Sequence, residues 1–132
     1  MENKLEIYDF LKSNGFKLTE HKSSNFFGDY YNTFSNNVFQ LRFNSSKSIE
    51  TIEIRSIGKK EGWYDVALVK ALLNNEVNLN KVTTIKEYSE FMKNELDRII
   101  ELFNRGNYPV TKKKLNELGN KRAKQMFPGM IK

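Results

Sequence analysis

Residues 48–73 read SIETIEIRSIGKKEGWYDVALVKALL. Residues 49–57 contain an alternation of apolar and polar side chains, which predicts a strand with one buried face. A short segment bracketed by Gly58 and Gly62 follows, and Asp65 is then placed to cap a helix with mostly apolar side chains. The pattern therefore predicts that the chain changes here from sheet to helix.

The sequence before this segment predicts one helix and three further strands. Asn3 has the type of a helix N-cap and Gly15 the type of a helix end, which bounds a helix over residues 4–13. Alternating side chains and polar turns predict strands over residues 16–22 and 38–43, and an aromatic run predicts a strand over residues 26–33 whose facing is open because its aromatic side chains occupy both parities. Residues 49–57 form the fourth strand. Short connections between four strands predict an antiparallel meander with one buried face.

The sequence after the segment predicts three helices, over residues 65–73, 85–104 and 112–127. Thr84 and Glu87 have the spacing of a capping box, and an apolar stripe from Ile85 to Phe103 follows at helical spacing. The last helix has Thr111 as its expected N-cap and three expected buried anchors, Leu115, Leu118 and Met126. We therefore expect a single α+β domain whose three later helices pack on one face of the sheet.

Length and composition agree with one folded domain. The chain has 132 residues, of which 39% are hydrophobic, enough for a substantial core. No run approaches the roughly 20 apolar residues of a membrane span, and the first residues lack the apolar part of a signal peptide. Cysteine is absent, which excludes disulfides and thiolate zinc sites. The expected location is the cytoplasm, with no membrane contact.

A search for catalytic motifs finds none. His21 is the only histidine, and no nucleophile or acidic motif surrounds it. The sequence GKKEG at residues 58–62 lacks the spacing of a phosphate-binding Walker loop. We therefore expect no enzymatic activity, no metal and no cofactor.

The positive charge is concentrated at one end of the chain. Residues 105–132 hold eight Lys or Arg and one acidic residue, a net +7, whereas residues 1–104 are close to neutral at −1. The last predicted helix could therefore contact phosphates through six cations, Lys112, Lys113, Lys114, Lys121, Arg122 and Lys124. No aromatic side chains alternate with these cations, so an ordinary solvated helix face is the competing interpretation.

Trp63 and Tyr64 also allow two interpretations. Next to the capping residue Asp65, they can pack the start of the helix against the sheet. Exposed, the same aromatic side chains would be good anchors for a protein partner.

These residues carry a resemblance to a known family. The run from Val38 to Phe43, the strand ending near Ile57, and Trp63-Tyr64-Asp65 leading into the apolar run from Leu68 to Leu73 resemble small α+β immunity proteins of bacterial polymorphic-toxin and contact-dependent growth inhibition systems. The long helix and the segment from Leu115 to Pro128 extend the likeness. The resemblance implies a cytoplasmic protein that binds one cognate toxin domain and occludes its active site or substrate groove, without catalytic residues of its own.

Immunity proteins against nuclease toxins are often acidic, whereas this chain is basic, so the resemblance leaves open whether the toxin contacts the basic end or the neutral body. Recognition surfaces vary within such families, and no site residues transfer from the resemblance. From the strand pattern we expect contacts at solvent-facing residues and the adjoining loop, namely Gln40, Arg42, Glu53, Arg55, Lys59, Lys60, Glu61, Trp63 and Tyr64. An ordinary polar sheet face is the competing interpretation. The identity of the toxin and the oligomeric state are open.

Overall fold

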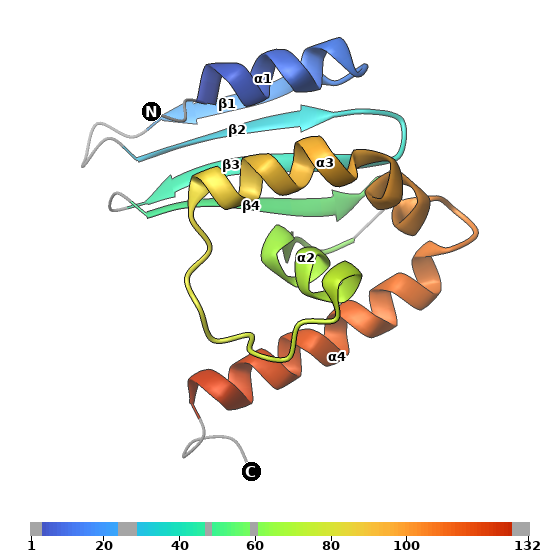
Figure 1. Cartoon of the computed structure of the whole chain (residues 1–132). Helices are drawn as coiled ribbons and strands as arrows, with labels where there is room; N and C mark the ends of the chain where they lie inside the picture. The colour runs from blue at the N-terminus through green and yellow to red at the C-terminus, as the bar shows by residue number, and fades with distance from the viewer. Residues whose placement is uncertain (1–3, 24–28, 47–48, 59–60, 128–132) are drawn as a thin grey trace.

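The computed structural model describes residues 4–23, 29–46, 49–58 and 61–127. Within these ranges the chain is α+β, as the sequence predicts, with four helices and one antiparallel sheet (Figure 1). The elements in order are α1 (Lys4–Ser13), β1 (Lys17–Ser23), β2 (Tyr30–Ser35), β3 (Phe39–Ser46), β4 (Ile49–Ser56), β5 (Tyr64–Asp65), α2 (Val66–Asn74), α3 (Ile85–Phe103) and α4 (Tyr108–Met126). The sheet has five strands, one more than predicted, because Tyr64 and Asp65 pair with β4 before α2 begins.

The sheet runs in the order β1-β2-β3-β4-β5, and each strand is antiparallel to its neighbour. Alternation along the strands separates two faces. The inner face is apolar and buried, and consists of Phe34, Phe39, Leu41, Phe43, Ile52 and Ile54. The opposite side, called the outer face from here on, consists of Thr19, Glu20, Tyr31, Thr33, Ser35, Gln40, Arg42, Asn44, Glu53 and Arg55.

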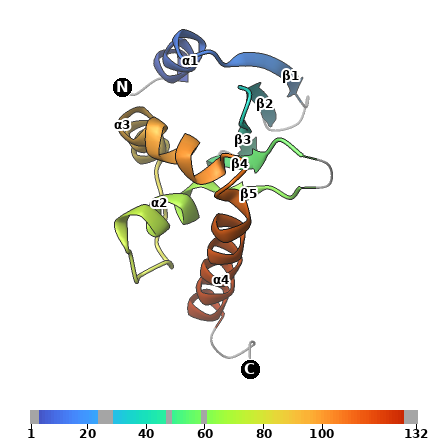
Figure 2. The ribbon, with the colours of Figure 1, turned by 90° about the vertical axis from the view of Figure 1, so that its right-hand side faces the viewer.

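Helices α1, α2 and α3 cover the inner face, as the two ribbon views show (Figures 1 and 2). From α1, the ring of Tyr8 lies 4.8 Å from that of Phe34 and 5.0 Å from that of Phe43. The predicted stripe of α3 is buried from Tyr88 to Phe103. The expectation that the three later helices pack on the sheet is wrong in one respect, because α4 lies against α2 and α3 instead.

Two helix starts agree with the capping chemistry expected from the sequence. Asp65 precedes α2 and accepts a hydrogen bond from the backbone N–H of Ala67 at 2.8 Å. Thr84 and Glu87 form the complete capping box at the start of α3. The expected N-cap of α1, Asn3, lies outside the described residues.

The predicted start of α4 at Lys112 is wrong, since the helix begins four residues earlier, at Tyr108. Pro109 lies in the first turn, where its fixed φ suits a helix and its missing N–H costs nothing. Thr111 is therefore inside the helix, where it is buried and its hydroxyl donates to the carbonyl of Leu102 at 2.7 Å. At the other end Met126 is 47% exposed, so it is not the predicted anchor, whereas Leu115 is fully buried.

The strands are displaced from their predicted bounds at the turns. β2 continues to Ser35, because the side chain of Asn36 closes the following turn by accepting from the N–H groups of Val38 and Phe39. β3 continues to Ser46, since its polar end still pairs with the start of β4. Residues 26–28 of the predicted second strand lie outside the described residues. In the described ranges, no helix is both long and apolar enough to cross a membrane.

Candidate functional site

The outer face of the sheet holds most of the residues that the sequence singles out for partner binding. Of the nine candidates, five belong to this face: Gln40, Arg42, Glu53 and Arg55 on the strands, and Trp63 against the two arginines. No helix lies over it within the described residues, as the view along the strands shows (Figure 2). Its side chains are nevertheless connected to one another, and the contacts fall into two groups.

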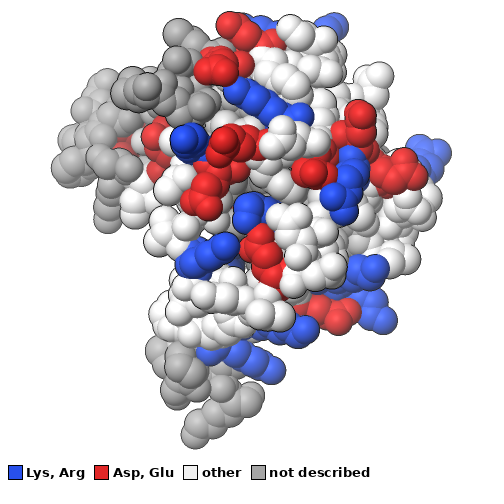
Figure 3. All heavy atoms as spheres, in the orientation of Figure 1, with Lys and Arg blue, Asp and Glu red and all other residues white. Residues whose placement is uncertain are grey.

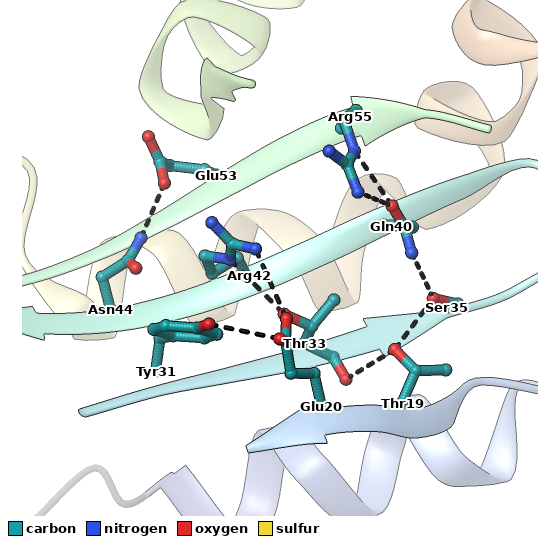
Figure 4. A network of polar contacts seen from close by, with 10 residues as sticks. All are labelled: Thr19, Glu20, Tyr31, Thr33, Ser35, Gln40, Arg42, Asn44, Glu53 and Arg55. Atoms are coloured by element: carbon teal, nitrogen blue, oxygen red, sulfur yellow. Dashed lines mark hydrogen bonds and ion pairs between the residues drawn. The ribbon is translucent and has the colours of Figure 1, made fainter. Parts of the chain in front are cut away.

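The first group is a chain of hydrogen bonds that crosses four strands (Figure 4). Arg55 of β4 donates from Nε to Oε1 of Gln40 at 3.0 Å, and from Nη2 to the same oxygen at 2.5 Å. The amide nitrogen of Gln40 donates to the Ser35 hydroxyl at 3.1 Å, which in turn lies 3.3 Å from the hydroxyl of Thr19 in β1. Each polar side chain in this chain is held in place by its neighbours.

The second group surrounds Arg42. Its guanidinium forms an ion pair with Glu20 at 3.5 Å and donates to the Thr33 hydroxyl at 3.4 Å. The Tyr31 hydroxyl also donates to Glu20, at 3.2 Å. Thr33 is only 2% exposed although it belongs to the outer face, which shows that the larger side chains cover it. The register places Glu53 opposite Arg42, yet Glu53 accepts from Asn44 at 2.8 Å instead.

Trp63 lies over these two arginines. The guanidinium carbons of Arg42 and Arg55 are 4.3 and 4.4 Å from the centroid of its ring. Arg42 is also 4.4 Å from the ring centroid of Tyr31, so that one guanidinium contacts two aromatic rings. We call these four residues the aromatic–arginine stack. Contacts of this kind contribute about 0.5–1 kcal/mol each where they are exposed, and more where water is excluded.

The two aromatic residues after Gly62 point to different parts of the molecule. Trp63 is half-buried on the outer face, which combines features of both interpretations of the sequence. Tyr64 pairs with Ile54 in the register of β5, and its hydroxyl donates to Asn116 of α4 at 2.8 Å. Tyr64 therefore joins the sheet to α4 and is not part of the outer face.

The predicted loop candidates are only partly described, because Lys59 and Lys60 lie outside the described residues. Glu61 accepts a hydrogen bond from Tyr108 at 3.0 Å and forms an ion pair with Lys112 at 3.1 Å. The hydrogen bond from Lys112, followed by that from Tyr108, lowers the pKa of the Glu61 carboxyl below 4.5. Glu61 thus fastens the loop to α4, a structural role that already occupies its carboxylate.

The six basic residues of α4 do not all lie on one side of the helix. Arg122 pairs with Asp65 at 2.9 Å and Lys112 with Glu61, so two of the six cations face the body of the protein. The other four cations are exposed, namely Lys113, Lys114, Lys121 and Lys124. At about 100° per residue they lie on one side of the helix, and the acidic residue Glu117 lies among them. Figure 3 shows the helical side of the molecule, where acidic and basic side chains are interspersed over most of the surface.

A partly buried polar cluster centred on Asp65 was not predicted from the sequence. In addition to capping α2, the Asp65 carboxylate accepts from the Tyr88 hydroxyl at 2.7 Å and from Arg122 at 2.9 Å. Burial, and then the negative charge of Asp65, raise the pKa of Tyr88 well above its usual range. The cluster borders an open cavity of about 610 Å³, which Ile49, Val82 and Met126 also line. The sequence predicted that Asp65 caps α2, but its pattern placed Tyr88 in the core and Arg122 among the surface cations.

The structure places His21, the histidine considered in the search for catalytic motifs, at the surface of the sheet. His21 is exposed in β1, and its Nδ1 contacts the side-chain oxygen of Asn32. No group of three or more His, Asp or Glu side chains in these ranges could hold a metal ion. The outer face is instead a fixed array of hydrogen-bonding and aromatic groups, which is suited to recognition.

Comparison of the whole chain with protein-family models, with curated proteins and with solved structures finds no match. The outer face is therefore the feature from which a function can be inferred.

Proposed function

We propose that this protein is an immunity protein, which binds a cognate bacterial toxin domain through the outer face and occludes the toxin's active site or substrate groove. The observation that carries the proposal is the aromatic–arginine stack on a sheet face that no described helix covers. Trp, Tyr and Arg are the residues that most often dominate the binding energy of protein interfaces. The resemblance found in the sequence supplies the kind of partner.

The connected hydrogen bonds of the outer face support the same proposal. A side chain that is already held in its bound orientation loses little conformational freedom on association, so more of its contact energy is retained as affinity. Arg42, Arg55 and Gln40 are held in this way before any partner arrives.

Under this proposal we expect a toxin domain to be encoded directly upstream of this chain, and the test uses that domain. Co-expression should restore the growth of bacteria that produce the toxin, and the two purified proteins should form a complex in isothermal titration calorimetry. Trp63→Ala should weaken this complex roughly 30-fold or more, because it removes the aromatic centre of the stack. The double variant Lys113→Glu/Lys121→Glu changes exposed residues of α4 and should bind as the wild type does.

Two results would argue against the proposal. Absence of both rescue and binding by the wild-type protein would reject the immunity function. A complex that tolerates Trp63→Ala but is lost in the α4 double variant would move the interface away from the outer face. Circular dichroism and urea unfolding of each variant separate lost binding from lost folding.

Nucleic-acid binding by α4 is the second candidate, and it is favoured by the exposed lysines on one side of that helix. Binding through phosphates would weaken steeply as salt rises. Fluorescence anisotropy with labelled single-stranded and duplex oligonucleotides, at low and at moderate salt, tests this function. No binding at low salt eliminates it, whereas binding that the α4 double variant abolishes supports it.

A further inference from the structure

Arg42 and Arg55 share the ring of Trp63 but differ in their charge balance. Arg42 is paired with Glu20, so its positive charge is compensated on the outer face. The hydrogen bonds of Arg55 go to a neutral acceptor, Gln40, and no acidic side chain in the described part of the chain forms an ion pair with it. Arg55 is thus a fixed cation that lacks a counter-charge among these residues.

The unused side of the Arg55 guanidinium can be identified from its hydrogen bonds. Nε and Nη2 both donate to Oε1 of Gln40, which occupies the N–H groups on one edge of the planar group. The neighbouring edge, formed by Nη1 and the second N–H of Nη2, remains. Nη1 has no hydrogen-bond partner among the described residues and is not one of their fully buried unpartnered atoms, so it retains access to solvent. Two parallel N–H groups on such an edge match the two oxygens of a carboxylate.

We propose that Arg55 binds a carboxylate of the partner protein in a two-pronged hydrogen-bonded ion pair. This inference rests on the proposed function and adds the chemistry of the contact. The ring of Trp63 and the amide of Gln40 fix the orientation of the guanidinium in advance, so that the partner's Asp or Glu meets a preformed fork. The partner surface over this point is therefore acidic.

The surrounding charges favour a protein carboxylate over a nucleic-acid phosphate. The acidic groups Glu20 and Glu53 belong to the same face as the two arginines, which makes these four residues neutral in sum. A nucleic-acid backbone carries many phosphates and would be attracted only weakly to these four residues, because their charges cancel. A single carboxylate can bind to the open edge of Arg55 alone.

The first arm of the test measures binding to the upstream-encoded toxin domain by calorimetry. Arg55→Gln should weaken binding roughly 30-fold or more, and Arg55→Lys should recover only part of the loss because lysine keeps the charge without the fork. Arg98→Gln, on α3, removes an exposed arginine away from the outer face and should bind as the wild type does. Arg55→Glu should in turn be rescued by one Asp→Arg or Glu→Arg change in the toxin domain.

The proposed function and this inference fail in different ways in that arm. If the wild type does not bind, the proposed function fails. If the wild type binds and Arg55→Gln binds equally well, the function stands and the role of Arg55 is overturned.

The second arm needs no partner and uses acetate as the carboxylate probe. Acetate replaces chloride at constant ionic strength while the side-chain resonances of the arginines are followed by NMR. The Arg55 resonances should shift along a saturable curve, whereas those of Arg42, already paired with Glu20, should change little. Equal responses of the two arginines would contradict the inference whatever the toxin does.

Discussion

The Asp65 side chain has more partners than the helix cap that the sequence predicts. One carboxylate caps α2, accepts from the hydroxyl of Tyr88 on α3 and pairs with Arg122 on α4. Three helices that are far apart in the sequence therefore meet at one side chain. Loss of this carboxylate leaves a buried hydroxyl without an acceptor and a half-buried cation without its counter-charge.

Asp65→Ala should therefore destabilise the protein by about 2–4 kcal/mol, which combines a lost helix cap with an unsatisfied buried donor. Urea unfolding followed by circular dichroism measures this change. Glu90→Ala, on the exposed side of α3, is the matched control and should stay within about 0.5 kcal/mol of the wild type. A loss for Asp65→Ala no larger than that of the control would show that the cluster contributes nothing beyond surface charge.

Among the elements, α4 combines few buried side chains with several polar attachments. Tyr108, Thr111 and Leu115 are its buried residues, and the ion pairs of Lys112 and Arg122 lie near its two ends. Gly119 interrupts an otherwise good helical sequence where the helix passes α2. A Cβ at this position would lie 3.8 Å from Cδ1 of Leu68, an ordinary van der Waals distance.

Gly119→Ala should stabilise the protein by about 1 kcal/mol, since alanine favours the helix and its methyl group fits against Leu68. Gly15→Ala provides the opposite case. Gly15 has open space around it but a φ of +86°, so a side chain there should cost about 1 kcal/mol. Thermal and urea unfolding of both variants measure these shifts. A loss of stability in Gly119→Ala would mean that the fit against Leu68 is tighter than the distance indicates.

The connection between α2 and α3 is held by an acidic group. Glu76 accepts from Lys70 at 2.6 Å and pairs with Lys81 at 3.7 Å. Partial burial alone would raise the pKa of Glu76, but the hydrogen bonds from Lys70 and Asn74 and the charges of the two lysines outweigh it and bring the pKa below 4.5. A carboxyl whose pKa is lowered by folding stabilises the folded state above its unfolded pKa, and this contribution is lost as the pH falls through the folded pKa.

Glu76→Gln should therefore be less stable than the wild type at neutral pH, and the difference should shrink as the pH is lowered below 4.5. Unfolding free energies from urea titrations across this range give the comparison. Glu101→Gln, on the exposed side of α3, controls for the general loss of one negative charge. A stability difference that does not change with pH would contradict the assigned role of Glu76.

The elements were predictable from the sequence to different degrees. The capping box of Thr84 and Glu87 and the long apolar stripe of α3 are local signals, and they located that helix to within one residue at its end. The start of α4 was predicted wrongly, because Pro109 is equally typical of a loop and of the first turn of a helix. β5 has only two residues, and it is a strand only because these residues pair with β4. Two residues are too few to show a periodic pattern in the sequence.

At the scale of the whole molecule, the single tryptophan reports on which surface is used. Trp63 is half-buried on the outer face, while α4 packs against α2 and α3 and does not cover that face (Figure 2). A partner that binds to the outer face should reduce acrylamide quenching of Trp63 fluorescence roughly twofold or more, because the core of an interface excludes solvent and the quencher dissolved in it. Binding confined to α4 should leave the quenching unchanged. The measurement thus separates the two candidate functions within one titration.

The alternation of β3 and β4 was enough to place Gln40, Arg42, Glu53 and Arg55 on one face, because side-chain direction in a strand follows directly from sequence parity. The stack itself was not predictable. Trp63 reaches the arginines only because the chain passes the edge of β4 before α2, and that path depends on tertiary packing. The same limitation explains Tyr64, which points to α4 although it adjoins Trp63 in the sequence.

Selection can act on the two faces of β3 and β4 almost independently. Phe39, Leu41, Ile52 and Ile54 determine whether the chain folds, and the residues between them project to the other side of the sheet. Substitutions at those intervening positions leave the core packing untouched, so their stability cost is small. Under the proposed function, a lineage can thus exchange one binding specificity for another by point changes on the outer face while it inherits the same hydrophobic interior.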